Sequence, residues 1–373
     1  MRPIGGKLSI VVLLITLMLV VVACSSAETE APEPAPTENE PTEANGTGGN
    51  DETGGEEESP FPPGLQPIIE AAKNEEKVVH FGLSADPAQT KELEEALQQF
   101  YGFEIKVELL SGFHPQKTSE IISAAKSGVP SGVDSFFSSV TTIPALQREG
   151  LVRKINWPEL GIPEAYVSLN GDGVRNFDNF AAAVFYNTDA VAADEAPQSY
   201  DDLLQEKWKN KITTVRTANT FVYMLEEMGE EYMDQFVEQI ADQVVFSATF
   251  PDVLSRVASG EFPLGLGSAP VQAVMQGAPI ALAPIEPLLI LPWSHVVLED
   301  AASPNLAILL TYFFHSEEGQ QFLAKHWGYN RIDTPNTPIA QLASGLESVI
   351  VKEEFVEQSG DKLQQYSQML GIE

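Results

Sequence analysis

The sequence predicts an α/β fold with two sheet-containing units. Short apolar runs alternate with segments of helical periodicity over residues 77–137 and again over residues 212–284. Strands that alternate with helices are typical of a parallel sheet covered by helices. About 310 residues follow the first 60, and this length suits two lobes or one large domain.

The first unit is expected to contain three strands and two helices. Apolar runs indicate the strands, and spacings of three and four residues between apolar side chains indicate the helices. The expected strands are 77–83 (KVVHFGL), 104–110 (EIKVELL) and 133–137 (VDSFF), and the expected helices are 89–100 and 118–127.

The second unit repeats the alternation, and a helical section follows it. The expected strands are 212–215, 244–247, 262–266 and 280–284, and the expected helices are 221–230, 251–258 and 270–276. In the last section, Ser303 resembles an N-cap, and Pro304 would occupy the first helical position. No apolar run of 18 residues lies beyond the N-terminus, which excludes a polytopic membrane protein.

The N-terminus has the pattern of a lipoprotein signal peptide. Arg2 and Lys7 precede an apolar run over residues 10–23, which is too short to span a bilayer comfortably. The tetrad VVAC, residues 21–24, resembles the bacterial lipobox, and Cys24 is the only cysteine of the chain. We therefore expect a signal peptide over residues 1–23 and lipidation of Cys24, with multiple acyl chains for stable anchoring. The alternative is an uncleaved anchor helix, and both interpretations put the remainder outside the cytoplasm.

Residues 24–60 are expected to form a disordered acidic tether. Residues 25–60 contain eleven acidic side chains, no basic one and no aromatic one. Such a composition buries too little apolar surface to offset the entropy of ordering. Residues 61–373 retain 43 acidic and 19 basic side chains, a formal net charge of −24. This charge excludes nucleic acid as a partner, because phosphate backbones require clustered Lys and Arg.

Three segments resemble the solute-binding proteins of ABC importers, in particular the group that includes ferric-ion, thiamine and phosphonate binders. They are IIEAAKNEEKVVHFGL at 68–83, YNTDAVAADEAPQSYDDLLQEKWKNKI at 186–212 and SPNLAILLTYFFHSEEGQQFL at 303–323. The resemblance covers roughly residues 66–330, with the segments in the family's order.

The resemblance implies a periplasmic-binding-protein-like type II fold, in which two α/β lobes enclose a ligand cleft and two hinge strands connect them. The run FAAAVFYN (180–187) would leave the first lobe, and PLLILPW (287–293) would return to it. The first lobe would then comprise residues 66–183 plus 288–373, and the second lobe residues 184–287.

The ligand is expected beyond the carboxyl ends of the strands, where helix N-termini present free N–H groups. Arg216 can supply a bidentate fork for a carboxylate or phosphate, which suggests an anionic organic molecule or an oxyanion. Tyr186 would end the hinge strand and face the cleft. Helix capping explains individual Ser and Thr residues equally well. The candidate ligand-binding residues are Ser84, Ser111, Gly112, Ser138, Ser139, Tyr186, Arg216, Thr217 and Ser268.

The residues do not match the ferric members of the group. Those proteins typically carry an adjacent tyrosine pair after the strand that corresponds here to residues 262–266, and this sequence contains no Tyr-Tyr pair. The five histidines also lack the local spacing of a metal site. We therefore expect no bound metal and no cofactor, with a ferric-ion binder as an alternative.

An extracellular hydrolase is a further alternative, and its motifs are incomplete. The run GLGSA at residues 265–269 lacks the second flanking glycine of a Gly-x-Ser-x-Gly elbow. Pro270 occupies the place of the third glycine of a dinucleotide fingerprint. We expect no enzymatic activity.

The sequence thus predicts a monomeric, extracytoplasmic lipoprotein that closes on a small solute. It would deliver the solute to a permease and ATPase complex, while Cys24 anchors it to the cell membrane. A ligand-sensing receptor lipoprotein would use the same cleft and is kept as an alternative.

Overall fold

The computed structural model describes residues 59–352, 355 and 359–372, which belong to one compact unit. The expected signal peptide, Cys24 and the tether up to residue 58 lie outside the described residues. Within those ranges, no helix is long and apolar enough to cross a membrane.

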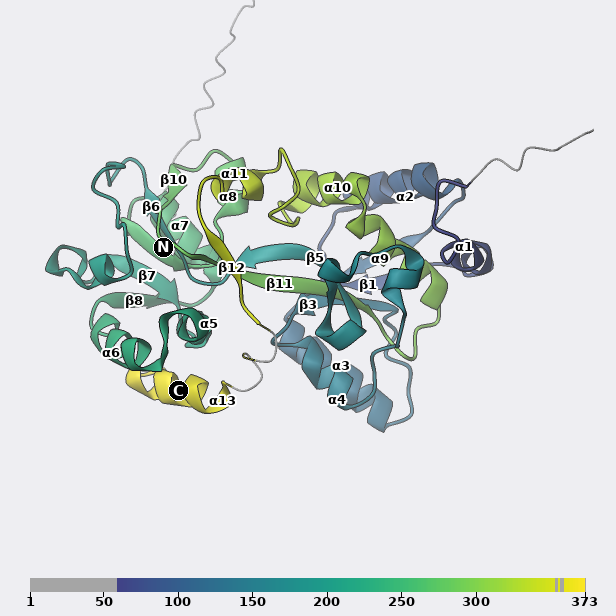
Figure 1. The fold of residues 1–373 in the computed structure, drawn as a ribbon, viewed down its shortest axis with the longest axis horizontal. Helices are drawn as coiled ribbons and strands as arrows, with labels where there is room; N and C mark the ends of the chain where they lie inside the picture. Colours follow the sequence, from purple (N-terminus) through teal and green to yellow (C-terminus); the bar gives the residue numbers. More distant parts are fainter. Residues whose placement is uncertain (1–58, 353–354, 356–358, 373) are drawn as a thin grey trace, which may run out of the picture. The chain divides into compact units, whose positions relative to one another are not determined.

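The first sheet combines parallel strands with long antiparallel ones (Figure 1). β1 pairs in parallel with β2 and β3, while β11 lies antiparallel between β3 and β5. β12 pairs with the beginning of β11. In sheet order the strands are β2 (Val107–Leu110), β1 (Val78–Phe81), β3 (Ser135–Ser139), β11 (Leu288–Val297), β5 (Gly173–Phe180) and β4 (Val167–Ser168), with β12 (Ser348–Ile350) beside β11.

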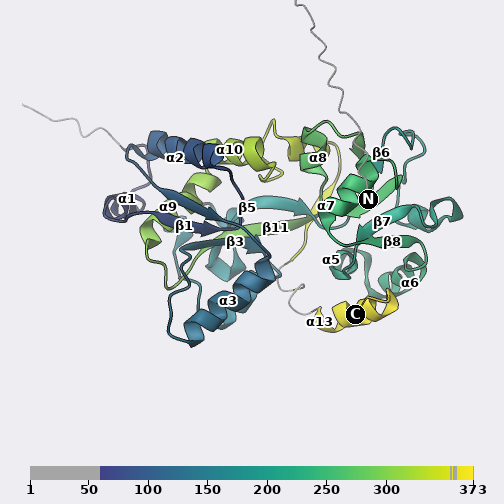
Figure 2. The same cartoon turned by 180° about the vertical axis from the view of Figure 1, so that it is seen from behind.

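Helices from both ends of the chain accompany this sheet (Figure 2). α9 packs on β1, β5 and β11, and it also contacts α1, α2 and α10. The helices are α1 (Gln66–Ala72), α2 (Pro87–Tyr101), α3 (His114–Lys126), α4 (Ile143–Arg148), α9 (Pro304–His315) and α10 (Glu317–Trp327). The short helix α11 (Pro338–Leu342) instead contacts α8 (Val271–Met275).

The second sheet has a parallel centre. β7 pairs in parallel with β8 and β9, and β6 lies antiparallel between β9 and β10. Its strands are β10 (Ile280–Leu282), β6 (Ala183–Asn187), β9 (Leu264–Gly267), β7 (Ile212–Val215) and β8 (Val244–Ser247), and its helices are α5 (Asn219–Met228), α6 (Glu230–Ile240), α7 (Phe250–Ala258) and α8 (Val271–Met275). The predicted α/β fold with two sheets is confirmed.

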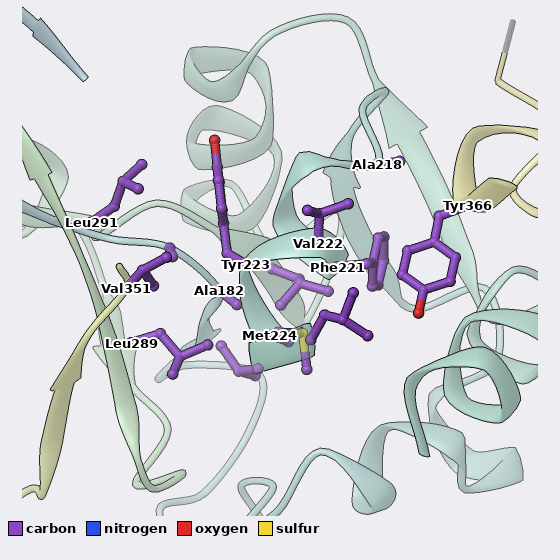
Figure 3. Packing of buried hydrophobic residues seen from close by; sticks show 14 of the residues in the cluster. Ala182, Ala218, Phe221, Val222, Tyr223, Met224, Leu289, Leu291, Val351 and Tyr366 are labelled. Atoms are coloured by element: carbon purple, nitrogen blue, oxygen red, sulfur yellow. The ribbon is translucent and has the colours of Figure 1, made fainter. Parts of the chain in front are cut away.

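The chain passes between the two sheets at residues 181–182 and again at residues 283–287. A backbone hydrogen bond joins each of these two segments to the strand that adjoins the other segment. Ala181 N donates to Leu289 O, and Ala283 N donates to Val184 O, each at 2.8 Å. A hydrophobic cluster that includes Ala182, Leu289 and Leu291 continues from these segments into the second sheet's helices (Figure 3). We propose residues 181–182 and 283–287 as the two hinges.

The last helix, α13 (Gly360–Met369), packs against α5 and α6. Tyr366 is fully buried beside Phe221 of α5 (Figure 3). Its hydroxyl donates to Asp234 Oδ1 at 2.9 Å. The expected first lobe included residues 288–373, but these contacts place α13 against helices of the second sheet. We therefore propose that residues 359–372 belong to the second lobe.

The helix α9 begins at Pro304, as the sequence predicts, but Ser303 does not cap it with its side chain. The carboxylate of Glu75, more than 200 residues earlier, accepts hydrogen bonds from Asn305 N at 3.1 Å and Leu306 N at 2.7 Å. The first turn of the helix therefore obtains its hydrogen-bond partner from a distant segment.

Candidate functional site: a cavity between the two sheets

A cavity of about 240 Å³ lies between strands β5 and β11 of the first sheet and the helices and loop beside the second sheet. This space equals about eight water molecules at roughly 30 Å³ each. We call it the aromatic cavity. It is lined by Phe177 and Asn179 of β5, Trp293 of β11, Phe250, Pro251 and Leu254 of α7, Ser268 and Ala269 after β9, Val271 and Gln272 of α8, and Gly328 and Tyr329 after α10.

Aromatic rings form much of the lining. The Phe177 and Tyr329 rings are stacked, with centroids 4.6 Å apart, and the Trp293 ring meets Phe177 edge-on at 5.9 Å. Phe177 and Trp293 are direct partners in the pairing of β5 with β11, so the sheet register sets their contact. Phe250 comes from the other side, at the first position of α7, which Thr249 caps through its side chain.

Neutral hydrogen-bonding groups complete the lining. Asn179 Nδ2 donates to Ser268 Oγ at 3.1 Å, and Asn179 Oδ1 accepts from Ala269 N at 3.3 Å. One amide of β5 therefore holds the loop that follows β9. The loop turns out of the strand at Gly267, whose φ of +152° favours glycine.

A second contact joins the two sheets' helices beside the cavity. Gln272 Nε2 of α8 donates to Trp327 O at 2.9 Å, and Trp327 Nε1 donates to Ser84 O at 2.6 Å. Gly328 adopts the left-handed conformation that ends α10, and a Cβ there would lie only 3.0 Å from Val271 Cγ1. The left-handed backbone and this close approach to α8 both favour a glycine at position 328.

The electrostatic character of the aromatic cavity is neutral. None of the twelve lining residues carries a formal charge. Burial raises the pKa of the Tyr329 phenol, so this group stays protonated at neutral pH. Trp293 Nε1 is buried and has no hydrogen-bond partner among the described residues. The lining therefore offers ring faces, amides and hydroxyls.

The structure places the candidate residues from the sequence at several different positions. Ser268 lines the aromatic cavity, and Ser84 contributes its carbonyl to the Trp327 contact. Ser111 and Gly112 line a separate hollow of about 280 Å³ together with Phe113, a residue that is 71% exposed. These loops do not converge on one site.

The candidates in β3 and β6 are buried. Ser138 and Ser139 lie in β3, where Ser139 Oγ is 2.7 Å from Thr141 Oγ1. Tyr186 was expected to face the cleft, but it is only 6% exposed and belongs to the hydrophobic cluster of Figure 3. Every residue of β6 is buried, because both faces of this strand are covered. The alternation of side chains therefore could not assign Tyr186 to the cleft.

Arg216 and Thr217 lie at the end of β7, away from the lining of the aromatic cavity. Arg216 is exposed, and its Nη2 donates to the carbonyl of Gly371 at 3.3 Å. Thr217 Oγ1 accepts from Asn219 N at 3.2 Å, which is a local turn bond. Neighbouring Asn219 lines another space, of about 360 Å³, between Thr141 and the start of α13.

Sequence reasoning missed most of the aromatic cavity. Phe177, Asn179, Phe250, Gln272, Trp293 and Tyr329 line it, and none was a candidate. Trp293 ends the run 287–293, which the sequence predicts to return to the first lobe. This position next to a hinge was the one sequence signal that could have identified a lining residue.

The donor atoms of the cavity do not suit ferric iron. A hard cation of this charge prefers carboxylate and phenolate oxygens, and the lining offers a single phenol, Tyr329, and no carboxylate. Among the residues that the structure describes, no group of three His, Cys, Asp or Glu side chains is arranged to hold a metal ion.

Comparison with known proteins identifies the family. The family model described as bacterial extracellular solute-binding protein matches residues 129–344. A comparison with curated protein sequences finds no match.

Solved structures share the fold at low sequence identity. Iron-bound HitA from Pseudomonas aeruginosa is 18% identical with a TM-score of 0.62, and the match covers 79% of this chain and 99% of that one. The ferric binding protein from Campylobacter jejuni is 13% identical with a TM-score of 0.65, over 80% and 100% of the two chains. The substrate binding protein of the ABC transporter from Agrobacterium tumefaciens is 17% identical with a TM-score of 0.62, over 80% and 96%. The fold is that of the type II periplasmic binding proteins, and the chain belongs to the bacterial extracellular solute-binding protein family.

Proposed function

We propose that this chain is the substrate-binding component of an ABC importer and that it holds its solute in the aromatic cavity. The observation that carries the proposal is that elements from both sides contribute to the lining. The first sheet supplies β5 and β11, residues 328–329 follow α10, and α7, α8 and the loop after β9 come from the side of the second sheet. A solute in this space contacts both lobes at once. It therefore stabilises the closed arrangement by its differential affinity, which is how such a protein signals that it is loaded.

The contacts beside the cavity support closure as the mechanism. The bonds from Asn179 to Ser268 and from Gln272 to the Trp327 carbonyl each join elements of the two sheets. Both involve uncharged groups at the surface of the cavity. Such bonds contribute about 1 kcal/mol each, so they favour the closed form without making it permanent. A moderate closing energy allows the solute to be released to a permease.

We propose an extracytoplasmic location and a lipid anchor at Cys24, on the sequence pattern of the N-terminus. Residues 24–60 would act as the tether that lets a monomer reach its permease and ATPase complex. Solute would be bound and handed over without chemical conversion. Of the candidates from the sequence, we retain Ser268 as a ligand contact and add Trp293, Phe177 and Tyr329.

Native mass spectrometry of the full chain, purified in detergent from its own cells, tests this proposal. We expect a co-purifying small molecule that raises the melting temperature when it is added back to stripped protein. Trp293 fluorescence should change on addition, because the ring lines the cavity. A stripped protein that responds to no component of a cell or medium extract would contradict the proposal.

A further inference from the structure

We infer that the solute is an uncharged, planar ring compound with hydrogen-bonding groups at its edge. This inference rests on the proposed function and specifies the chemistry of the same cavity. It differs from the anionic solute that Arg216 suggested, since that guanidinium lies elsewhere and donates to a backbone carbonyl.

The first argument is charge. Moving an ion from water into a site without a countercharge is costly, and proteins therefore pair buried charges. None of the lining residues is ionised at neutral pH. The excess of acidic side chains in residues 61–373 also repels anions at long range. An uncharged solute avoids these costs.

The second argument is shape. Phe177, Tyr329 and Trp293 form one aromatic wall, with Phe250 on the side of the second lobe. Aromatic side chains gain most from offset stacking or edge contacts with another ring. A flat ring therefore contacts this wall better than a branched or tetrahedral molecule does. The volume, about that of eight waters, suits one ring or two fused rings.

The third argument is the arrangement of polar groups. Ser268 Oγ already accepts from Asn179, so its proton is available for an acceptor on the solute. Gln272 uses Nε2 for the Trp327 carbonyl, which leaves its amide oxygen to accept from a donor. Both residues come from the side of the second sheet, whereas the rings of Phe177, Trp293 and Tyr329 come from the side of the first. A ring that carries an amide or a similar group at its edge satisfies both.

Three compounds of similar size and planarity separate the charge classes: benzamide, benzoate and benzamidine are neutral, anionic and cationic respectively. We would titrate each into the full chain after removal of co-purified solute and follow the melting temperature. We expect benzamide to bind at least ten-fold more tightly than benzoate and benzamidine. Equal or tighter binding of either ion would overturn the inference.

Variants locate the effect. Trp293→Leu should weaken benzamide binding at least ten-fold, and Ser268→Ala, which preserves the ring wall, should weaken it several-fold. Phe113→Leu is the matched control, because Phe113 is exposed and lies outside the lining. If Trp293→Leu does not fold, Ser268→Ala alone carries the test. Unchanged benzamide affinity in Ser268→Ala, or an equal loss in Phe113→Leu, would refute this assignment of the site.

The charge of the native solute tests this inference separately from the proposed function. A charged co-purifying molecule that raises the melting temperature would refute the inference and leave solute capture intact. Absence of any co-purifying molecule, together with no response to extracts, would refute both.

Discussion

Acidification from pH 7.5 to pH 5 should lower the free energy of unfolding by about 2 kcal/mol for each of two core histidines. His80 and His295 are fully buried in the first sheet, and their rings are stacked 5.1 Å apart. His80 Nδ1 lies 2.6 Å from Ser135 Oγ, and His295 Nδ1 lies 3.1 Å from Asn176 Nδ2. Burial, aided by neighbouring histidines, lowers the pKa of His80 to about 3 and the pKa of His295 well below its usual value.

Acid lowers the free energy of unfolding because the unfolded chain takes up more protons than the folded chain. Below the unfolded-state pKa of about 6.5, the unfolded chain binds protons at both histidines while the folded chain does not, so stability falls as the pH falls. One pKa unit corresponds to about 1.36 kcal/mol, and pH 5 lies about 1.5 units below 6.5, which gives about 2 kcal/mol per histidine. Two residues together would remove about 4 kcal/mol from a typical total of roughly 5–15 kcal/mol.

Urea unfolding at half-unit pH steps measures this effect. His80→Phe also removes the Ser135 contact and should lower stability at every pH, so the informative quantity is the slope of stability against pH between 6.5 and 5. We expect this variant to reduce the slope by about one proton. Between pH 7.5 and 8.5 the two histidines are neutral in both states, and the slopes should agree. An unchanged slope in the acidic window would refute the reasoning.

Three further predictions concern other parts of the chain. Glu75→Ala should cost about 1–2 kcal/mol of stability by chemical denaturation, because its carboxylate caps α9; the exposed neighbour gives the control Glu76→Ala, and an equal effect of both would exclude capping. Gly328→Ala should cost about 1 kcal/mol or more of stability, because the backbone of residue 328 is left-handed. The added Cβ would also press against Val271 of α8, so solute affinity should fall in binding titrations; unaltered affinity would show that this contact does not contribute to closure. Cys24→Ser should move the protein from the membrane fraction into the medium or leave it unprocessed, as followed by fractionation and mass measurement; a processed, membrane-retained form would contradict lipidation.

Local patterns predicted much of the α/β alternation. Strands expected at 212–215 and 244–247 match β7 and β8 residue for residue. In contrast, β5 was missed because its sequence, GVRNFDNF, contains two charged residues. Arg175 Nε donates to Asp178 Oδ1 at 2.6 Å, and the Asp178 side chain is fully buried. A strand whose charges pair with each other has no apolar alternation, so periodicity alone cannot find it.

The site was harder to predict than the fold for a geometric reason. Loops that follow parallel strands are readable from sequence, and one of them, at Ser268, lines the aromatic cavity. The other walls come from β5, β11, α7, α8 and the residues after α10, so the cavity forms only once these distant elements are placed against one another. That placement depends on contacts such as those of Asn179 and Gln272, which join residues about 90 and 55 positions apart.

The position of α13 has a mechanical consequence. Because β12 belongs to the first sheet and α13 contacts α5 and α6, the polypeptide crosses the boundary between the proposed lobes a third time. This third link adds to the two proposed hinges and restricts how far the proposed lobes can rotate relative to each other. We therefore expect the proposed lobes to open mainly by bending at the two hinges. Removal of residues 359–373 should allow the lobes to rotate about each other as well.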